Sequence, residues 1–431
     1  MNQTELYVSL DIGSSSIKVL IGEMTNGTLN VIGVGNVKSN GIRKGAIVDI
    51  DATVQSIKKA IDQAERMIGM SINEVVLGIP ANQAMLHHVK GVVAVNSENR
   101  EITDDDLDRV IESAQVMSIP PERELVNLVP KQFIVDHLDE IKDPRGMIGI
   151  RLEMDGTMLT TSKTILHNVL RCVERAGLQI REIYLQPLAS GYFALSEDEK
   201  NHGTAFIDIG GGSTTIAIFQ DGHLTHTSVL PVGGDHLTKD LSIVLKTPTE
   251  QAEKIKHQYG HAFYDEASDD ELFEVPVIGA DMKEQYSQRY ISEIIGVRLE
   301  ELFELVLEEF YRMGLQDLPG GVVITGGVAK LEGLTQLARH ILQTRVRLYT
   351  PEYIGVREPG YATAVGLIRY AHKEDQFYNR LGGNSALGQS KKPEHINSPA
   401  PKKQKHSNNV KEEDKESVMG KARKFLDKFF E

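Results

Sequence analysis

The stretch DIGSSSIKVLIGE, from Asp11 to Glu23, recurs in a related form about half a chain later as DIGGGSTTIAIFQ, from Asp208 to Gln220. Each copy has an aspartate at the end of an apolar strand, a turn of small residues and a second strand rich in β-branched residues, so each predicts a β-hairpin. Glycine and serine let a backbone approach a phosphate closely, so that amides and hydroxyls can surround its oxygens. One such turn is equally well explained as an ordinary tight hairpin, whereas two related turns favour a phosphate-binding site.

The charged residues of the two turns suit a nucleotide with its metal ion. Asp11 and Asp208 stand at strand tips, and Mg²⁺ fits them because it keeps several waters and needs only one or two carboxylates. Lys18 would add a positive charge toward the phosphates. A third glycine pair, Gly326 and Gly327 in VITGGVAKLEGL, follows another apolar strand, where a nucleoside could lie against bare backbone. Three glycine turns at strand ends predict a nucleotide crevice.

Composition narrows the classes of partner. The chain has 431 residues, of which 40% are hydrophobic and 25% charged, as in an ordinary multidomain globular protein. Its formal net charge of -14 argues against non-specific binding of its body to nucleic acid or to an anionic membrane, so we expect no nucleic-acid partner and only local membrane contact. A lone Cys172, and an opening ELYVSLDIG in place of a charged and then apolar leader, favour a reducing cytosol.

The body alternates strand-like and helical patterns, which is typical of α/β layers. Strand-like runs include LYVSLDIG, VIGVGNV, VVLGIP, TAFIDIGGG and GVVITGG, and helical patterns cover 53–69, 164–177 and 285–314. Residues 84–162 differ in texture and predict a small α+β insert, with Thr103 and Asp106 forming a capping box. From about Gln376 to Ser417 the chain is rich in small polar residues and lysine, which predicts a flexible tether.

The last fourteen residues, 418–431, have the pattern of an interfacial helix. On a helical wheel an apolar stripe is separated from a basic group; the stripe holds Met419, Ala422, Phe425, Leu426, Phe429 and Phe430, and the basic group holds Lys421, Arg423, Lys424 and Lys428. Against an anionic leaflet one such segment would bind weakly and reversibly, and avidity would strengthen the binding if protomers polymerise. The alternative is that the stripe docks back on the globular body.

The order of these motifs resembles the actin, Hsp70 and sugar-kinase superfamily: a phosphate hairpin, LQPLASGYFAL, a second hairpin, the TGG loop and GYATAVGLIRYA. Within it, PKQFIVD, SKTILHNVLRCVERAGL, IDIGGGSTTIA and PEYIGVREPGYATAVGL resemble the FtsA family of bacterial cell-division proteins. The resemblance covers residue 1 to about 372 and the tail. It implies an α/β actin-like ATPase fold, with two related lobes around a nucleotide cleft and an FtsA-type small α+β subdomain inserted in the first lobe.

The resemblance also implies a division of the chain. The first core subdomain would comprise 1–83, 163–199 and 356–375, and the insert 84–162. The second core subdomain would comprise 200–240 and 312–355, and 241–311 would form the small subdomain of the second lobe. Residues 376–417 would form a disordered linker and 418–431 a membrane-targeting helix.

In the cleft, the resemblance implies ATP with Mg²⁺. Phosphates would be contacted by Ser14, Ser15, Lys18, Gly210, Gly211, Gly212 and Ser213, while Asp11 and Asp208 would organise the metal. Gly326 and Gly327 would flank the adenosine, and Lys254 would reach the ribose or adenine, although a lysine in its helix is also explained by simple solvation. Gln186 would position an attacking water. Because no strong general base is evident, we expect at most a slow Mg²⁺-dependent ATPase.

The function implied is that of a protein that polymerises on the cytoplasmic side of the cell membrane at the division septum. It would anchor FtsZ filaments of the Z ring, with Arg289 and Arg298 pairing with the C-terminal peptide of FtsZ, unless these arginines are merely solvated. The insert would contact the next protomer and later division proteins, unless it is only a stable decoration. A small-molecule kinase of the same fold is the main alternative, and an Hsp70-like chaperone would need a folded substrate domain in place of the polar tether.

Overall fold

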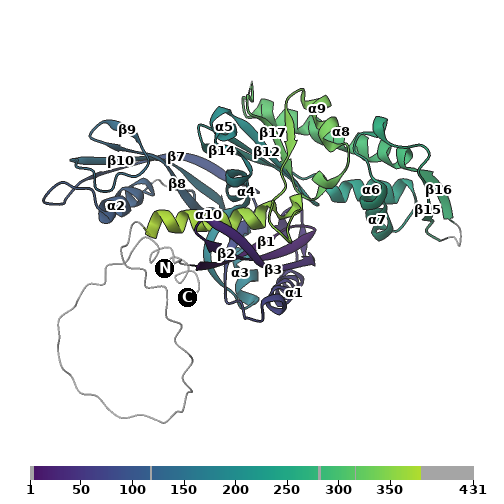
Figure 1. Cartoon of the computed structure of the whole chain (residues 1–431), viewed down its shortest axis with the longest axis horizontal. Helices are drawn as coiled ribbons and strands as arrows, with labels where there is room; N and C mark the ends of the chain where they lie inside the picture. Colours follow the sequence, from purple (N-terminus) through teal and green to yellow (C-terminus); the bar gives the residue numbers. More distant parts are fainter. Residues whose placement is uncertain (1–3, 117–118, 280–282, 316, 380–431) are drawn as a thin grey trace, which may run out of the picture. The chain divides into compact units, whose positions relative to one another are not determined.

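The computed structural model describes residues 4–116, 119–279, 283–315 and 317–379 (Figure 1). The chain divides into two compact units. The first comprises Met1–His88, Ser118–Val129 and Thr157–Glu374, and the second comprises Val89–Met117, Pro130–Gly156 and Asp375–Glu431. We describe each unit by itself.

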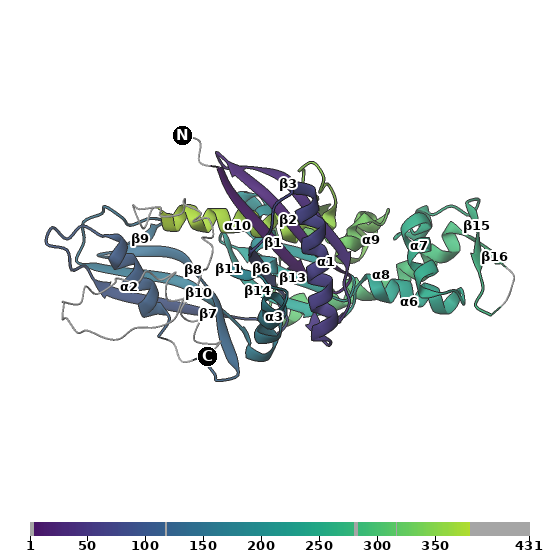
Figure 2. The same cartoon turned by 90° about the horizontal axis from the view of Figure 1, so that it is seen from below.

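Two five-stranded sheets of the same topology form the frame of the first unit (Figures 1 and 2). The first has the order β11 (Gln179–Leu185), β6 (Glu74–Ile79), β1 (Thr4–Ile12), β2 (Ser16–Thr25), β3 (Thr28–Lys38). The second has the reverse-listed order β14 (His223–Leu230), β13 (Thr214–Gln220), β12 (Thr204–Ile209), β17 (Gly321–Thr325), β18 (Val346–Leu348). In each sheet three antiparallel strands joined in sequence are followed by two parallel strands. The two related lobes expected from the sequence repeat are therefore confirmed.

Both repeated motifs form the predicted hairpins. Strands β1 and β2 pair antiparallel with Asp11 opposite Lys18, and strands β12 and β13 pair with Asp208 opposite Thr215. Strand β12 is buried on both faces: Ala205, Ile207 and Ile209 belong to the core beneath the helices of the second lobe, while Phe206 on the other face approaches α4 (Gln186–Ala194). This burial of both faces explains why the repeat reads as a nearly continuous apolar run.

Helices α1 (Ile50–Ile68) and α3 (Lys163–Arg175) pack against each other, and α1 packs on the first sheet (Figure 2). Both ends of α1 follow sequence signals. The Asp49 carboxylate accepts a hydrogen bond from the Ala52 N–H at 3.0 Å, and Gly69 ends the helix in the left-handed conformation at φ 71°. The predicted helical patterns at 53–69 and 164–177 are thus confirmed.

Helices α4 and α10 (Ala362–Asn379) connect the two lobes. Gly366 of α10 lies against α4 so closely that a Cβ would come within 2.6 Å of the Ser190 Cα. Gly191 of α4 faces Phe219 of the second sheet, whereas Ser9 of the first sheet donates a hydrogen bond to the Ala364 carbonyl of α10 at 2.8 Å. Each helix therefore packs on the sheet of the other lobe, which holds the two hairpin tips in register.

On its other face the second sheet shares one apolar core with the helices that cover it. These helices are α6 (Gly234–Val244), α7 (Thr249–Tyr259), α8 (Gln288–Arg312) and α9 (Leu334–Leu342), and a ribbon of β15 (Leu272–Pro276) and β16 (Lys283–Ser287) precedes α8. The shorter elements of the unit are β4 (Ile42–Arg43), β5 (Ala46–Ile47), α5 (Glu197–His202) and the 3-10 turns Tyr264–Glu266, Gly327–Lys330 and Pro359–Tyr361. The helical pattern read from residue 285 begins too early, because 285–287 pair with β15 and the Ser287 hydroxyl caps α8.

A four-stranded sheet with the order β7 (Met85–Ala94), β10 (Arg151–Ser162), β8 (Arg123–Val135), β9 (Leu138–Ile141) accompanies α2 (Asp104–Ala114). The boundaries of the second unit fall within β7, β8 and β10. The predicted capping box is present at α2, where the Thr103 N–H donates to the Asp106 carboxylate at 2.9 Å. The α+β texture predicted for the insert is confirmed, while its exact limits of 84 and 162 stay a prediction.

Helix α10 continues to Asn379, past the point at Gln376 where the sequence predicts a tether. The rest of that tether and the predicted membrane helix at 418–431 lie outside the described residues. Among the helices that the structure describes, none is long and apolar enough to cross a membrane.

Candidate functional site

The tips of the two repeated hairpins meet in the first unit. Ser15 of the β1–β2 turn donates a hydrogen bond to the Asp235 carboxylate at 3.2 Å, beside the β12–β13 turn. A Cβ on Gly211 would lie 1.6 Å from the Ser15 Oγ, and one on Gly212 would lie 2.8 Å from the Ser14 Oγ. Only glycine therefore fits at positions 211 and 212 beside these serines.

The second turn is also closed on itself by backbone contacts. The Gly234 N–H donates to the Gly210 carbonyl at 2.9 Å, the Asp235 N–H donates to the Gly211 carbonyl at 2.8 Å, and the Gly210 N–H donates to the Ser213 carbonyl at 3.0 Å. A Cβ on Gly233 would lie 2.6 Å from the Gly210 carbonyl oxygen. The turn and the first residues of α6 thus form a backbone cradle of the kind that binds phosphate oxygens.

Asp11 is buried, with 6% of its surface exposed, at the end of β1. The Lys18 Nζ lies 3.7 Å from one carboxylate oxygen, and the Gln186 Nε2 donates a hydrogen bond to the other at 2.9 Å. Burial raises the pKa of Asp11 above its ordinary value, and Lys18 and Gln186 offset only part of the rise. Gln186, which begins α4, therefore reaches the metal-site residue that the sequence predicted.

Asp208 holds the equivalent position in the second lobe. Thr363, near the start of α10, donates a hydrogen bond to its carboxylate at 3.4 Å, as Gln186 does to Asp11. Burial and the nearby negative charge of Asp11 raise the pKa of Asp208 to about 6. Two carboxylates that repel each other in a buried place, with Lys18 between them, form a donor set that suits a divalent cation.

A metal ion at this place would depend on ligands beyond the protein. In the described part of the chain no group of three or more His, Cys, Asp or Glu side chains could hold a metal by itself. Two carboxylates leave most of an octahedral shell to water and to phosphate oxygens, which is how Mg²⁺ usually binds with nucleotides. The residues present fit Mg²⁺ in that manner.

The third glycine pair lies beside Asp208. Strand β17 pairs with β12 so that Thr325 is opposite Asp208, and Gly326 follows with φ 94°. A Cβ on Gly326 would lie 2.3 Å from the Asp208 Oδ1, whereas Gly327 has no neighbour within 4 Å of the same point. Gly326 is thus required by the backbone and its neighbour, while Gly327 offers an open surface to a ligand.

Lys254 and its neighbour Lys256 have exchanged the places that the sequence suggested. Lys254 is exposed, whereas Lys256 is buried and donates hydrogen bonds to the Gly234 carbonyl at 3.2 Å, the Thr238 hydroxyl at 2.8 Å and Glu253 at 2.7 Å. Burial opposes ionisation of Glu253, but hydrogen bonds from His257, Lys256 and Thr238 lower its pKa to about 2. The sequence reading missed Lys256, although its helical spacing from the buried Ala252 pointed inward.

The two arginines predicted to meet an acidic peptide already have carboxylate partners in the chain. Arg298 pairs with Asp240 at 2.7 Å and with Glu301, and Arg289 lies 3.6 Å from Asp269 and 3.7 Å from Glu293. An acidic peptide would have to compete with these groups. Their role in partner binding stays a prediction.

The raised pKa of Asp208 predicts a pH-dependent cost to stability. Because the folded state holds this proton up to about pH 6 and the unfolded chain releases it near pH 3.8, stability falls as pH rises through that window. Asp208→Asn should therefore unfold at higher urea concentration than the natural chain at pH 8, by at most about 3 kcal/mol and by about half of that at pH 5. Equal stability of the two proteins at pH 8 would contradict the burial argument.

Comparisons with known proteins agree with this arrangement. A family model described as "Cell division protein FtsA" matches residues 205–366, and a model described as "SHS2 domain inserted in FTSA" matches residues 81–160. The cell division protein FtsA of Bacillus subtilis is 57% identical over 383 residues, which cover 89% of this chain and 87% of that protein. FtsA of Enterococcus hirae is 45% identical over 378 residues, covering 88% and 86% respectively.

Among solved structures, MreB5 of Spiroplasma citri bound to ADP superimposes with a TM-score of 0.55 at 14% identity, covering 88% of this chain and 99% of MreB5. At that identity the likeness shows the fold alone. It matches the arrangement of two duplicated sheets described above.

Proposed function

The chain belongs to the FtsA family of cell division proteins and has the actin-like fold with the inserted subdomain of that family, and from this premise we propose that it binds ATP between its two lobes. It polymerises on the cytoplasmic side of the cell membrane at the division septum. There it anchors FtsZ filaments through its C-terminal segment and recruits later division proteins.

One observation carries the nucleotide proposal: two aspartate-tipped glycine turns occupy equivalent places in two lobes and face each other across Ser15 and Gly211. Such a pair can surround a chain of phosphates from both sides, because each turn offers backbone amides and small side chains. Support also comes from MreB5, a protein of this fold whose structure contains ADP.

In this proposal Ser14, Ser15 and the turn 210–213 hold the phosphates, and Lys18 contributes positive charge. Mg²⁺, when bound beside Asp11 and Asp208, would neutralise phosphate charge. The open backbone at Gly327 receives the adenosine, and the buried Lys256 is better placed than the exposed Lys254 to fix the loop beneath it, through the Gly234 carbonyl.

Gln186 is the residue proposed to orient water. Its amide nitrogen is committed to Asp11, so its Oε1 is the atom that would accept a hydrogen bond from a water molecule. A glutamine amide orients water but does not take its proton at neutral pH. We therefore expect hydrolysis to be slow.

The partner surfaces follow from the family and from the sequence. The small subdomain 241–311, with Arg289 and Arg298, is proposed to bind the acidic C-terminal peptide of FtsZ, and the insert is proposed to contact the next protomer and later division proteins. The segment 418–431 is proposed to bind the anionic membrane.

Electron microscopy on lipid monolayers tests the proposal as a whole. With ATP the full chain should form filaments on an anionic monolayer, and a chain ending at Ser417 should leave the monolayer bare while still forming filaments in solution. A small-molecule kinase would form no filaments in either case. Failure of the full chain to assemble with ATP, Mg²⁺ and lipid together would refute the proposal.

A further inference from the structure

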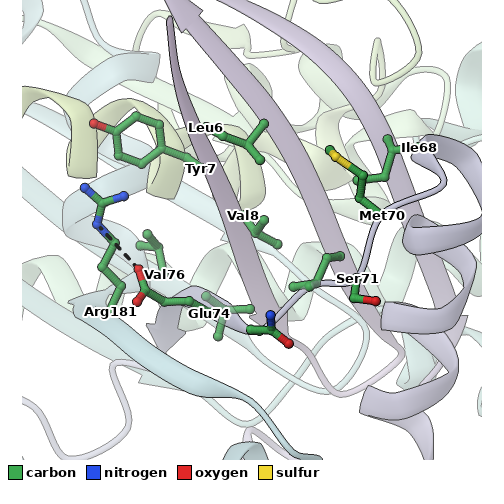
Figure 3. A pocket seen from close by; sticks show the side chains of 12 residues that line it. Leu6, Tyr7, Val8, Ile68, Met70, Ser71, Glu74, Val76 and Arg181 are labelled. Atoms are coloured by element: carbon green, nitrogen blue, oxygen red, sulfur yellow. Dashed lines mark ion pairs between the residues drawn. The ribbon is translucent and has the colours of Figure 1, made fainter. Parts of the chain in front are cut away.

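An apolar hollow of about 280 Å³ lies in the first unit at the start of the first sheet (Figure 3). Figure 3 shows Leu6, Val8, Ile68, Met70 and Val76 around it, contributed by β1, by the end of α1 and its following loop, and by β6. Its volume is just below the range of ordinary ligand sites and suits one aromatic side chain.

The hollow is separate from the nucleotide site. Leu6 and Asp11 lie on the same strand, five residues apart, which corresponds to about 17 Å of extended chain. Leu6 is 44% exposed and Met70 is 53% exposed, so large apolar side chains face solvent at its mouth. Apolar surface of this kind, rimmed by polar residues, is typical of a docking site.

The rim is predominantly acidic. Glu74 lines the hollow, the Glu5 carboxylate accepts a hydrogen bond from the Tyr7 hydroxyl at 2.8 Å, and the Glu65 carboxylate accepts one from the Ile72 N–H at 2.6 Å. The one arginine there, Arg181, lies 3.9 Å from Glu74, as the dashed line in Figure 3 marks, and stacks over the Tyr7 ring at 4.8 Å. An apolar ligand with basic neighbours would match this rim.

The chain itself provides such a ligand close at hand. His372 of α10 contacts the Tyr7 ring at 5.8 Å between centroids, and α10 continues for seven residues beyond it, about 10 Å of helix. The next thirty-eight residues, 380–417, would span about 35 Å as a flexible coil. They lead to 418–431, where Phe425, Phe429 and Phe430 stand among basic residues.

We propose that the hollow bounded by Leu6 and Met70 receives an aromatic side chain of the segment 418–431 of the same chain when that segment is not on a membrane. The inference rests on the proposed membrane role of the segment and adds its regulation. In the docked state the apolar stripe is withheld from lipid. Assembly on a membrane shifts the balance, because many segments then bind one surface together.

The tether makes even weak docking effective. A flexible linker of this length gives a local concentration on the order of 1 mM. If the hollow binds the segment with a Kd of about 0.1 mM, the segment is docked about nine-tenths of the time, and losing the hollow should raise the apparent affinity of the monomer for vesicles about tenfold.

A single tryptophan can report the docking, because the natural sequence contains none. In the full chain carrying Phe429→Trp, without lipid, the emission should be shifted to the blue and resist acrylamide quenching, compared with a peptide of residues 418–431 with the same change. Adding Leu6→Glu and Met70→Glu should restore the emission of the peptide. Met67→Glu, which adds a charge at a 61% exposed methionine outside the hollow, should leave the signal unchanged.

Three outcomes would overturn the inference: peptide-like emission in the full chain, blue-shifted emission that survives Leu6→Glu with Met70→Glu, or a signal that grows with protein concentration, which would mean docking on a second copy. Vesicle binding is measured separately at low protein concentration. Normal vesicle binding with peptide-like emission sinks the docking alone, whereas buried emission that depends on the hollow, without any vesicle binding, sinks the membrane role alone.

Discussion

Asp208→Asn is expected to lower the affinity for ATP in the presence of Mg²⁺ on the order of 100-fold, since an interaction with a charged group contributes about 1.5–3 kcal/mol. Asparagine keeps the shape of the side chain and its contact with Thr363 but removes the negative charge that we assign to the metal site. Isothermal titration with a slowly hydrolysed ATP analogue, with Mg²⁺ and then with EDTA, measures the effect. Only the Mg²⁺-dependent part of the affinity should fall.

Asp221→Asn is the matched control for this substitution. Asp221 is exposed in the turn after β13, at the end of that strand remote from the glycine turn, and asparagine tolerates its φ of 53°. Its affinity should equal that of the natural chain. If Asp208→Asn retained full Mg²⁺-dependent affinity, the two aspartates would not form the metal site and the nucleotide proposal would lose its main support.

Asp208→Asn should also gain stability at pH 8 while it loses affinity. A buried carboxylate with a raised pKa destabilises the fold wherever it is ionised, and no structural advantage explains its retention at the end of β12. The combination of higher stability and lost binding is the behaviour of a residue that serves a ligand. A purely structural residue would lose stability on the same change.

The duplicated sheets could be predicted from the sequence because the constraint is local. A turn that approaches phosphate closely needs glycine or serine at particular positions, and Gly211 and Gly212 are fixed by the serines of the other turn. The same two motifs therefore marked both the hairpins and the site. Gln186 and Thr363, which donate to the two aspartates, follow strands far along the chain, so only Gln186 could be placed, and that by family resemblance.

Features that depend on several distant segments could not be predicted. Lys256 rather than Lys254 faces inward because α6 packs on that side of α7, and a short helix of mixed polarity does not announce its buried face. The apolar hollow joins residues near 6, 70 and 181, none of which forms a motif. Residues 285–287 form a strand only because β15 lies beside them.

Phe429→Glu combined with Phe430→Glu is expected to abolish co-sedimentation with vesicles of anionic lipid. Each phenylalanine contributes about 1.5–3 kcal/mol when buried, and each added carboxylate is repelled from the anionic leaflet by about 1 kcal/mol. The loss per segment, on the order of 5–8 kcal/mol, exceeds what one weak anchor supplies. Because every protomer of a filament carries it, avidity of about 10² to 10⁴, equivalent to roughly 3–5 kcal/mol, does not compensate.

Asn408→Glu with Asn409→Glu adds the same two charges within the predicted tether and leaves the apolar stripe intact. That control should sediment nearly as well as the natural chain at moderate salt, because a charge in a flexible tether can remain more than a Debye length, about 8 Å, from the leaflet. If both double variants lost binding equally, general charge repulsion and not the stripe would govern attachment. If the Phe429 and Phe430 variant still sedimented, the anchor would have to lie elsewhere, since the acidic body with its net charge of -14 is repelled by the same surface.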